Sequence, residues 1–270
     1  METPIGRELR EHTWRWVVAL LIGLVVVGMD LWLQWRSRVA ADAYVEASAA
    51  FARQWGVEAE DPGALLEQAA VLNVAYAKMT AAGEATRVGW ASLALLTAFG
   101  YFFLARCDRV SIGFVETPAQ GWRPWCGVAW RIGLVVLAVA LPLAVLWRFM
   151  GWEWGGAWET ASNWQWEISV GLIGCPIFEE LIYRLAVCVP LAARFGAWPA
   201  ILVSGVLFAL LHVAYGVQNP INAVAGFLFA WTFLKSGTIL VPIVLHSLGN
   251  LIGYSLLQIA AASGLQPVLS

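Results

Sequence analysis

The sequence predicts an all-α membrane protein, a polytopic helical bundle with about seven transmembrane helices. Composition is the first reason. Of the 270 residues, 60% are hydrophobic and 13% are charged, whereas a soluble domain is about 45–50% apolar and about 25% charged. The mean hydropathy of +0.71 agrees with this. The apolar residues also gather in runs of about 20, the length that a helix needs to cross a bilayer. We therefore expect a multi-pass protein embedded in the lipid bilayer.

The apolar runs place the predicted spans along the chain. The first run could be a signal peptide, because Ala41-Asp42-Ala43 offers a small-x-small cleavage site. Its length, and Arg36 and Arg38 behind it, favour an uncleaved anchor instead. Asp30, near the far end of this run, is predicted to be an interfacial acid that reaches water. The predicted spans cover about residues 16–33, 88–105, 125–147, 168–191, 198–215, 220–234 and 238–261.

Residues 36–87 form the only sizeable segment that is polar enough to lie outside the membrane. Asp61-Pro62 supplies a helix N-cap followed by proline at the first helical position. Ala81-Ala82-Gly83 is interpreted as the end of that helix. The prediction is two short interfacial helices between the first two spans.

A second interfacial segment is predicted at residues 147–166, which are rich in tryptophan. Tryptophan is enriched at membrane interfaces because its ring is apolar and its N–H is polar. A cage for an aromatic ligand is the alternative interpretation. The tryptophans are Trp147, Trp152, Trp154, Trp158, Trp164 and Trp166.

Charge and cysteine usage narrow the function classes. The net charge of −2 argues against a nucleic-acid partner. The four cysteines have no C-x-x-C spacing, so they are interpreted as packing residues rather than a disulfide framework or a zinc knuckle. Lysine and arginine are slightly more frequent on the side of the N-terminus, which predicts that the N-terminus is cytoplasmic.

Polar side chains interrupt three of the last spans. Glu179, Glu180 and Arg184 lie in one, His212 in the next, and His246 with Asn250 in the last. A charge at the bilayer centre costs about 2.5–3.5 kcal/mol, and such residues face the bundle interior or a wet cavity. On a helix, residues four apart share a face, so Glu180 and Arg184 can pair, whereas Glu179 points elsewhere. We therefore expect the three faces to meet in one cavity.

A cavity with these groups suits hydrolysis by water. Glu180 or Glu179 could act as a general base, and an imidazole or the Asn250 amide could stabilise an oxyanion. Ser247 lies on another face from His246, which disfavours a serine nucleophile. Glu180, His212 and His246 are also a possible ligand set for a divalent metal such as zinc. Two competing hypotheses are a proton-coupled transporter and a haem protein with His212 and His246 as axial ligands.

The motifs Glu179-Glu180-x-x-x-Arg184, Phe208-x-x-x-His212 and His246-x-x-x-Asn250 resemble, in this order, the signatures of a known family. It is the CAAX-protease and bacteriocin-processing (CPBP) family of intramembrane proteases, which includes the type II CAAX prenyl endopeptidase. The resemblance implies a helical bundle with endopeptidase activity. In it, Glu180 or Glu179 would activate water with help from His212, and His246 with Asn250 would form the oxyanion site. Members have been described as metalloproteases and as glutamic proteases, and we favour metal-free glutamate activation.

The resemblance also divides the chain. Residues 165–262 are expected to be the catalytic membrane core, and residues 1–164 an N-terminal membrane region without a matching signature. The expected partner is a membrane-associated protein or peptide substrate, and the expected location is the inner (cell) membrane of a bacterium. A third competing hypothesis is a non-catalytic immunity or scaffold protein that keeps the family's bundle.

Overall fold

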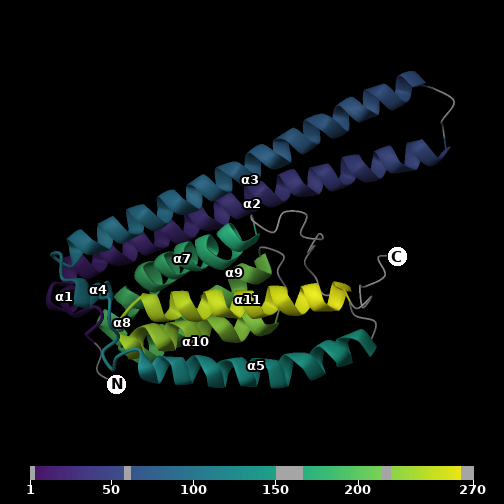
Figure 1. Ribbon diagram of the computed structural model, residues 1–270. Helices are drawn as coiled ribbons and strands as arrows, with labels where there is room; N and C mark the ends of the chain where they lie inside the picture. Colours follow the sequence, from purple (N-terminus) through teal and green to yellow (C-terminus); the bar gives the residue numbers. More distant parts are fainter. Residues whose placement is uncertain (1–3, 58–61, 150–166, 215–219, 263–270) are drawn as a thin grey trace. The chain divides into compact units, whose positions relative to one another are not determined.

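The structure is a computed structural model that describes residues 4–57, 62–149, 167–214 and 220–262 (Figure 1). In these residues every regular element is a helix, which confirms the all-α prediction. The elements are α1 Arg7–Glu11, α2 Thr13–Val57, α3 Pro62–Leu104, α4 Arg109–Ile112, α5 Arg123–Phe149, η1 Glu167–Gly174, α7 Cys175–Glu180, η2 Leu181–Cys188, α8 Val189–Phe195, α9 Ala197–Ala214, α10 Pro220–Ser236 and α11 Leu240–Ala262.

The chain has helices long and apolar enough to cross a membrane. Within the described residues these are Thr13–Arg53, Leu66–Leu104 and Ala197–Ala214, and Val224–Ser236 and Leu240–Ser255 are shorter apolar helices. The protein is therefore an integral membrane protein. Each predicted span coincides with a helical stretch, whereas the count of seven stays a prediction.

The predicted pair of short helices within residues 36–87 is wrong. α2 continues without a break to Val57, and α3 continues from Pro62 to Leu104. The predicted helix start at Pro62 is confirmed, but Ala81-Ala82-Gly83 does not end the helix. Alanine, glutamate, lysine and arginine are strong helix formers, and one glycine costs only about 1 kcal/mol. The position of residues 36–87 at the membrane interface stays a prediction.

Contacts within the chain divide it into two compact units, of which one is Val25–Leu95. In this unit α2 and α3 pack along each other as an antiparallel pair (Figure 1). The less exposed positions alternate at spacings of three and four, the heptad pattern of a coiled coil. They are Val26, Asp30, Leu33, Ser37, Ala40, Tyr44, Ala47 and Phe51 in α2, and Gln68, Leu72, Ala75, Met79, Ala82, Thr86, Gly89 and Leu93 in α3.

Asp30 is a corrected prediction within this coiled coil. The sequence predicted an acid that reaches water, but the residue is only 3% exposed. The indole Nε1 of Trp90 donates a hydrogen bond of 2.7 Å to its Oδ1. One turn along, the Thr86 hydroxyl lies 2.9 Å from the Ala82 carbonyl oxygen of its own helix and 3.3 Å from the Leu33 carbonyl oxygen of α2. Both polar side chains of this seam therefore have hydrogen-bond partners.

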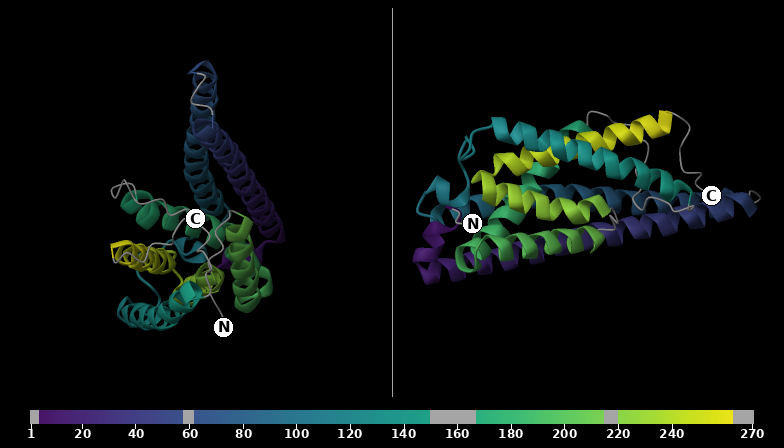
Figure 2. Two further views of the ribbon diagram at one scale, coloured as in Figure 1. Left: turned by 90° about the vertical axis from the view of Figure 1, so that its right-hand side faces the viewer. Right: turned by 90° about the horizontal axis from the view of Figure 1, so that it is seen from below.

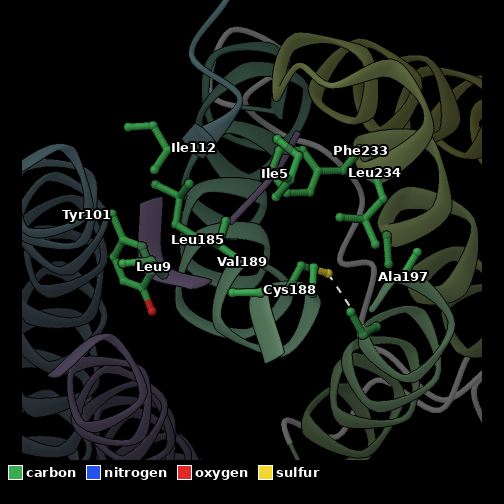
Figure 3. Close-up of a cluster of buried hydrophobic side chains, with 14 of the residues drawn as sticks. Ile5, Leu9, Tyr101, Ile112, Leu185, Cys188, Val189, Ala197, Phe233 and Leu234 are labelled. Atoms are coloured by element: carbon green, nitrogen blue, oxygen red, sulfur yellow. Dashed lines mark hydrogen bonds between the residues drawn. The ribbon is translucent and has the colours of Figure 1, made fainter. Parts of the chain in front are cut away.

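The other unit, Met1–Leu24 with Leu96–Ser270, contains the main hydrophobic core (Figure 3). η2 and α8 lie at its centre, where Leu185 and Val189 are fully buried. The N-terminal segment also belongs to it, because Ile5 is fully buried and the Gly6 amide donates to the Ser111 carbonyl at 2.7 Å. Helix α8 is also bonded to the start of α2, because the Trp16 indole donates to the Pro190 carbonyl at 2.8 Å.

The stretch from η1 to α8 is one continuous helical run that carries the acids. Two π-helical segments, η1 and η2, flank the α-helical turn α7. π-Helical turns are rare and often occur at functional sites. Figure 2 shows the chain from two further sides. The predicted interfacial segment 147–166 lies outside the described residues except for the end of α5, and so does the predicted boundary between residues 164 and 165.

Helices α9 and α10 approach each other through two glycines. A Cβ atom on Gly226 would lie 2.7 Å from the Cβ of Phe208 and 3.0 Å from the Gly205 carbonyl oxygen. A Cβ on Gly205 would meet the ring of Phe227. Small residues allow membrane helices to pack this closely. The contact fixes the position of Phe208, which lies one turn before His212.

Candidate active site

Three helical stretches carry the residues that the sequence singled out. Glu179 and Glu180 end α7, and Arg184 follows one turn later in η2. His212 lies in the last turn of α9. His246 and Asn250 occupy successive turns of α11. The structure brings the two acids, the arginine and both histidines into one cluster, as expected from the cost of leaving polar groups in hydrocarbon.

Glu180 and Arg184 form a fully buried ion pair within the cluster. Arg184 Nε donates to Glu180 Oε2 at 2.6 Å, and both side chains are 0% exposed. A second, longer contact joins Arg184 Nη2 to Glu180 Oε1 at 3.5 Å. On its other side, Arg184 Nη1 donates to the Ser204 hydroxyl of α9 at 2.7 Å. The predicted Glu180–Arg184 pairing is confirmed.

His246 connects this pair to α11. Its Nδ1 lies 3.0 Å from Glu180 Oε1. Because a carboxylate that faces a guanidinium is an acceptor, His246 Nδ1 carries the proton and donates it. The ring stacks on Phe229 with 4.7 Å between ring centroids. The other ring nitrogen, Nε2, lies 4.0 Å from Oε2 of Glu179.

His212 faces the same carboxylate oxygen from α9. Its Nδ1 lies 2.9 Å from the Phe208 carbonyl oxygen of the preceding turn. A carbonyl only accepts, so Nδ1–H is the donor, and in the neutral ring Nε2 keeps its lone pair. That Nε2 lies 3.8 Å from Oε2 of Glu179. The ring stacks on Phe208 at 4.2 Å between centroids, which fixes its plane.

The two acids therefore have different surroundings. Both oxygens of Glu180 are occupied by Arg184 and His246, and the side chain is 0% exposed. The Glu179 side chain is 18% exposed and directs Oε2 toward the Nε2 atoms of both imidazoles. Distances of 3.8 and 4.0 Å are too long for direct hydrogen bonds and are of the length that one water molecule bridges.

Asn250 borders the cluster. Its Nδ2 donates to the Gly171 carbonyl of η1 at 2.8 Å. This bond ties α11 to η1 one turn beyond His246, where a Cβ on Gly171 would collide with the hydroxyl of Tyr254. An amide carries two N–H groups, so a second donor remains available on Nδ2.

Sequence reasoning missed Ser204 and Phe229, the residue that stacks on His246. Ser204 precedes Phe208 by one helical turn and His212 by two, so the three share a face of α9. A hydroxyl at that spacing in an apolar helix was the available signal. Phe229 of α10 had no such signal, because one more phenylalanine in an apolar helix looks like lipid-facing or core packing.

The predicted metal ligand set does not fit the geometry. Glu180 has both oxygens engaged, and His246 directs Nδ1 rather than a free lone pair at it. Among the described residues no group of three or more histidine, cysteine, aspartate or glutamate side chains is arranged to hold a metal ion. The haem hypothesis does not fit either, because the Glu179 carboxylate lies against the Nε2 atoms of both histidines.

Comparison with known proteins finds a match for the part of the chain that contains this cluster. Residues 161–252 match the family model described as Type II CAAX prenyl endopeptidase Rce1-like. The match contains all six predicted site residues and confirms the resemblance that the three motifs indicated. No curated protein and no solved structure matches the chain.

Proposed function

We propose that this protein is an intramembrane endopeptidase that hydrolyses a peptide bond of a membrane-associated protein or peptide. The family match implies a protease of the CAAX type. The observation that carries the proposal is the position of Glu179, whose Oε2 faces one nitrogen of His212 at 3.8 Å and one of His246 at 4.0 Å. A carboxylate between two imidazoles in a buried site is suited to activate water.

Glu179 is the general base in this proposal, with His212 as its partner. A water molecule between them donates one hydrogen to Glu179 Oε2 and the other to the lone pair of His212 Nε2. Glu179 takes the proton as the water oxygen bonds to the carbonyl carbon of the substrate. The same proton then passes to the leaving amine as the C–N bond breaks, which releases a carboxylic acid and an amine.

His246 and Asn250 stabilise the oxyanion of the tetrahedral intermediate. His246 donates its Nδ1–H to Glu180. Its Nε2 can therefore donate a hydrogen bond to the oxyanion only when the ring is an imidazolium. Asn250 contributes the N–H that is not bonded to Gly171. Donors fixed before the reaction stabilise developing charge most effectively.

Glu180 and Arg184 support the site without touching the substrate. The sequence left open which glutamate is the base. Glu180 is fully buried and already bonded on both oxygens, which favours a supporting role for it and the base role for Glu179. Zinc has no role in this proposal, because both oxygens of Glu180 are engaged and His246 directs a donor N–H at that carboxylate.

The test is a comparison of protein termini in cells that carry the wild-type protein or the Glu179→Gln variant. Termini of membrane proteins and peptides are mapped by mass spectrometry. Termini that appear only with the wild type would name the substrate. Glu84→Gln, the same change at a glutamate in α3 whose side chain is 62% exposed, is the matched control and should leave the wild-type termini in place.

Two outcomes would contradict the proposal. In the first, no terminus differs between cells with the wild type and cells with Glu179→Gln, but a phenotype such as bacteriocin sensitivity differs. The non-catalytic immunity function would then replace the protease function. If the termini depend on Glu180 and not on Glu179, the protease assignment stands but the base is misassigned.

The proposal includes about seven spans with a cytoplasmic N-terminus in a bacterial cell membrane. It places the loop between α3 and α4 in the cytoplasm. Cys107 in that loop is exposed. In a variant whose other cysteines are replaced by alanine, an impermeant maleimide should label Cys107 in inverted vesicles but not in intact cells. Labelling in intact cells would reverse the orientation.

A further inference from the structure

We infer that Ser204 is a positioning residue of the active site, acting on His246 through Arg184 and Glu180. This inference rests on the proposed function, because it deepens the role of the same site. Ser204 belongs to none of the three sequence motifs. Its side chain lies in the middle of α9, two turns before His212, and the residue is 0% exposed.

The hydrogen bonds form one continuous path. Ser204 Oγ accepts from Arg184 Nη1 at 2.7 Å. Arg184 Nε donates to Glu180 Oε2 at 2.6 Å. Glu180 Oε1 then accepts from His246 Nδ1 at 3.0 Å. The path starts on α9, passes through η2 and α7, and ends on the imidazole of α11.

Ser204 holds the side of the guanidinium that Glu180 does not reach. The carboxylate bonds Nε and Nη2, and the hydroxyl bonds Nη1, so the planar group is held from both sides. All three residues are fully buried, so water cannot replace a lost acceptor there. The Cys188 thiol also lies beside the guanidinium, but sulfur is a weak acceptor.

Loss of the hydroxyl should therefore move the imidazole. Without Ser204 Oγ, Arg184 Nη1 must turn toward another acceptor, and the bonded Glu180 carboxylate shifts with the guanidinium. His246 Nδ1 follows Glu180, which changes the direction of Nε2 toward Glu179. A serine that only packs within α9 would instead affect stability and leave His246 unchanged.

The first test does not depend on activity. The chain has three histidines, so nitrogen-15 labelled imidazoles give a spectrum that single histidine substitutions can assign. In the full-length protein in detergent, Ser204→Ala should shift the His246 nitrogen resonances and leave those of His12 unchanged. Unchanged His246 resonances in a folded Ser204→Ala protein would overturn the inference.

Matched variants keep this test decisive. Ser111→Ala removes another fully buried serine hydroxyl, which accepts from the Glu8 amide at 3.1 Å, and should not move the His246 resonances. A shift as large as that of Ser204→Ala would mean that any buried serine loss disturbs His246, and would overturn the inference. If Ser204→Ala does not fold, Ser204→Cys replaces it, because the thiol is a weaker acceptor of similar size. Ser204→Cys should also shift the His246 resonances.

The second test measures catalysis once a substrate is known. Ser204→Ala should lower kcat by about tenfold to a hundredfold with KM unchanged, because a misplacement of about 1 Å can cost about a hundredfold. Ser204→Thr, which keeps the hydroxyl, should recover most of kcat. Added to Arg184→Lys, Ser204→Ala should cost less than it does alone, because the two residues act on one path.

The outcomes separate this inference from the proposed function. If the wild type cleaves no substrate but His246 shifts in Ser204→Ala, the protease assignment fails and the positioning path stands. If the wild type and Ser204→Ala have the same kcat, the positioning role fails while the protease assignment remains.

Discussion

Glu180 and Asp30 are both acids buried in apolar helices, one in each unit of the chain, but their partners differ. Glu180 is bonded by a guanidinium and an imidazole from η2 and α11. Asp30 receives the indole N–H of Trp90. The partners of Glu180 can carry positive charge and the indole cannot. Burial of an acid by itself therefore does not mark a candidate active site, whereas convergence of ionisable side chains from several helices does.

The packing around the two acids explains the difference. In residues 25–95 each helix has one neighbour within the unit, and the coiled-coil seam brings a polar residue only against the facing helix. In the other unit the run from η1 to α8 packs against α9 and α11. Only the second arrangement can direct side chains from three helices at one point.

The largest expected effect is the loss of hydrolysis in Glu179→Gln. Removal of a general base costs about 10²–10⁴-fold in rate. The side chain keeps its size, so the protein should fold normally, as measured by its thermal unfolding in detergent. Asp30→Asn is the paired measurement and should leave the rate unchanged. A similar rate loss in both variants would mean that the loss is not specific to Glu179.

Removing one side of the buried ion pair should have the largest effect on stability. In Arg184→Met the Glu180 charge remains buried without its cation, which costs about 3–5 kcal/mol. Thermal or denaturant unfolding of the purified protein measures this. The double variant Glu180→Gln/Arg184→Met removes the charge as well and should regain part of the loss. Equal stability of the single and double variants would show that the pair carries no buried-charge penalty.

Gly226→Ala tests how tightly the packing of α9 on α10 fixes the site. The added Cβ would lie 2.7 Å from the Cβ of Phe208. Overpacking of this kind costs about 1–3 kcal/mol, and a displaced Phe208 should also lower kcat by moving the stacked His212. Gly83→Ala in the other unit is the control, since its Cβ would meet no atom within 4 Å. A rate loss in Gly83→Ala would mean that the effect of Gly226→Ala on the rate does not depend on the packing of α9 on α10.

The smallest expected effect is the change in stability caused by Asp30→Asn. Asp30→Asn keeps a carbonyl oxygen for the Trp90 indole, so we expect a stability change below about 1 kcal/mol. Trp90→Phe removes the donor and should cost more than Asp30→Asn, up to about 3 kcal/mol. Both values come from unfolding of the purified protein. The reverse order would show that the charge of Asp30, rather than its hydrogen bond, stabilises the coiled coil.

Several features of this protein follow from local sequence. Hydropathy located the helical stretches, because the cost of leaving water is a property of each residue and adds along a helix. The spacing of Glu180 and Arg184 predicted their pairing, because residues four apart share a face of any helix. The same rule grouped Phe208 with His212 and His246 with Asn250. These relations need no knowledge of the neighbouring helices.

Only the tertiary structure distinguished the two adjacent glutamates. Their neighbours in the sequence are nearly the same, but the contacts from α9 and α11 differ, and these depend on how helices far apart in the chain pack. The role of Ser204 as a partner of Arg184 and the burial of Asp30 against Trp90 were undetermined for the same reason. The sequence predicted which polar groups enter the membrane, and helix packing decided which of them meet.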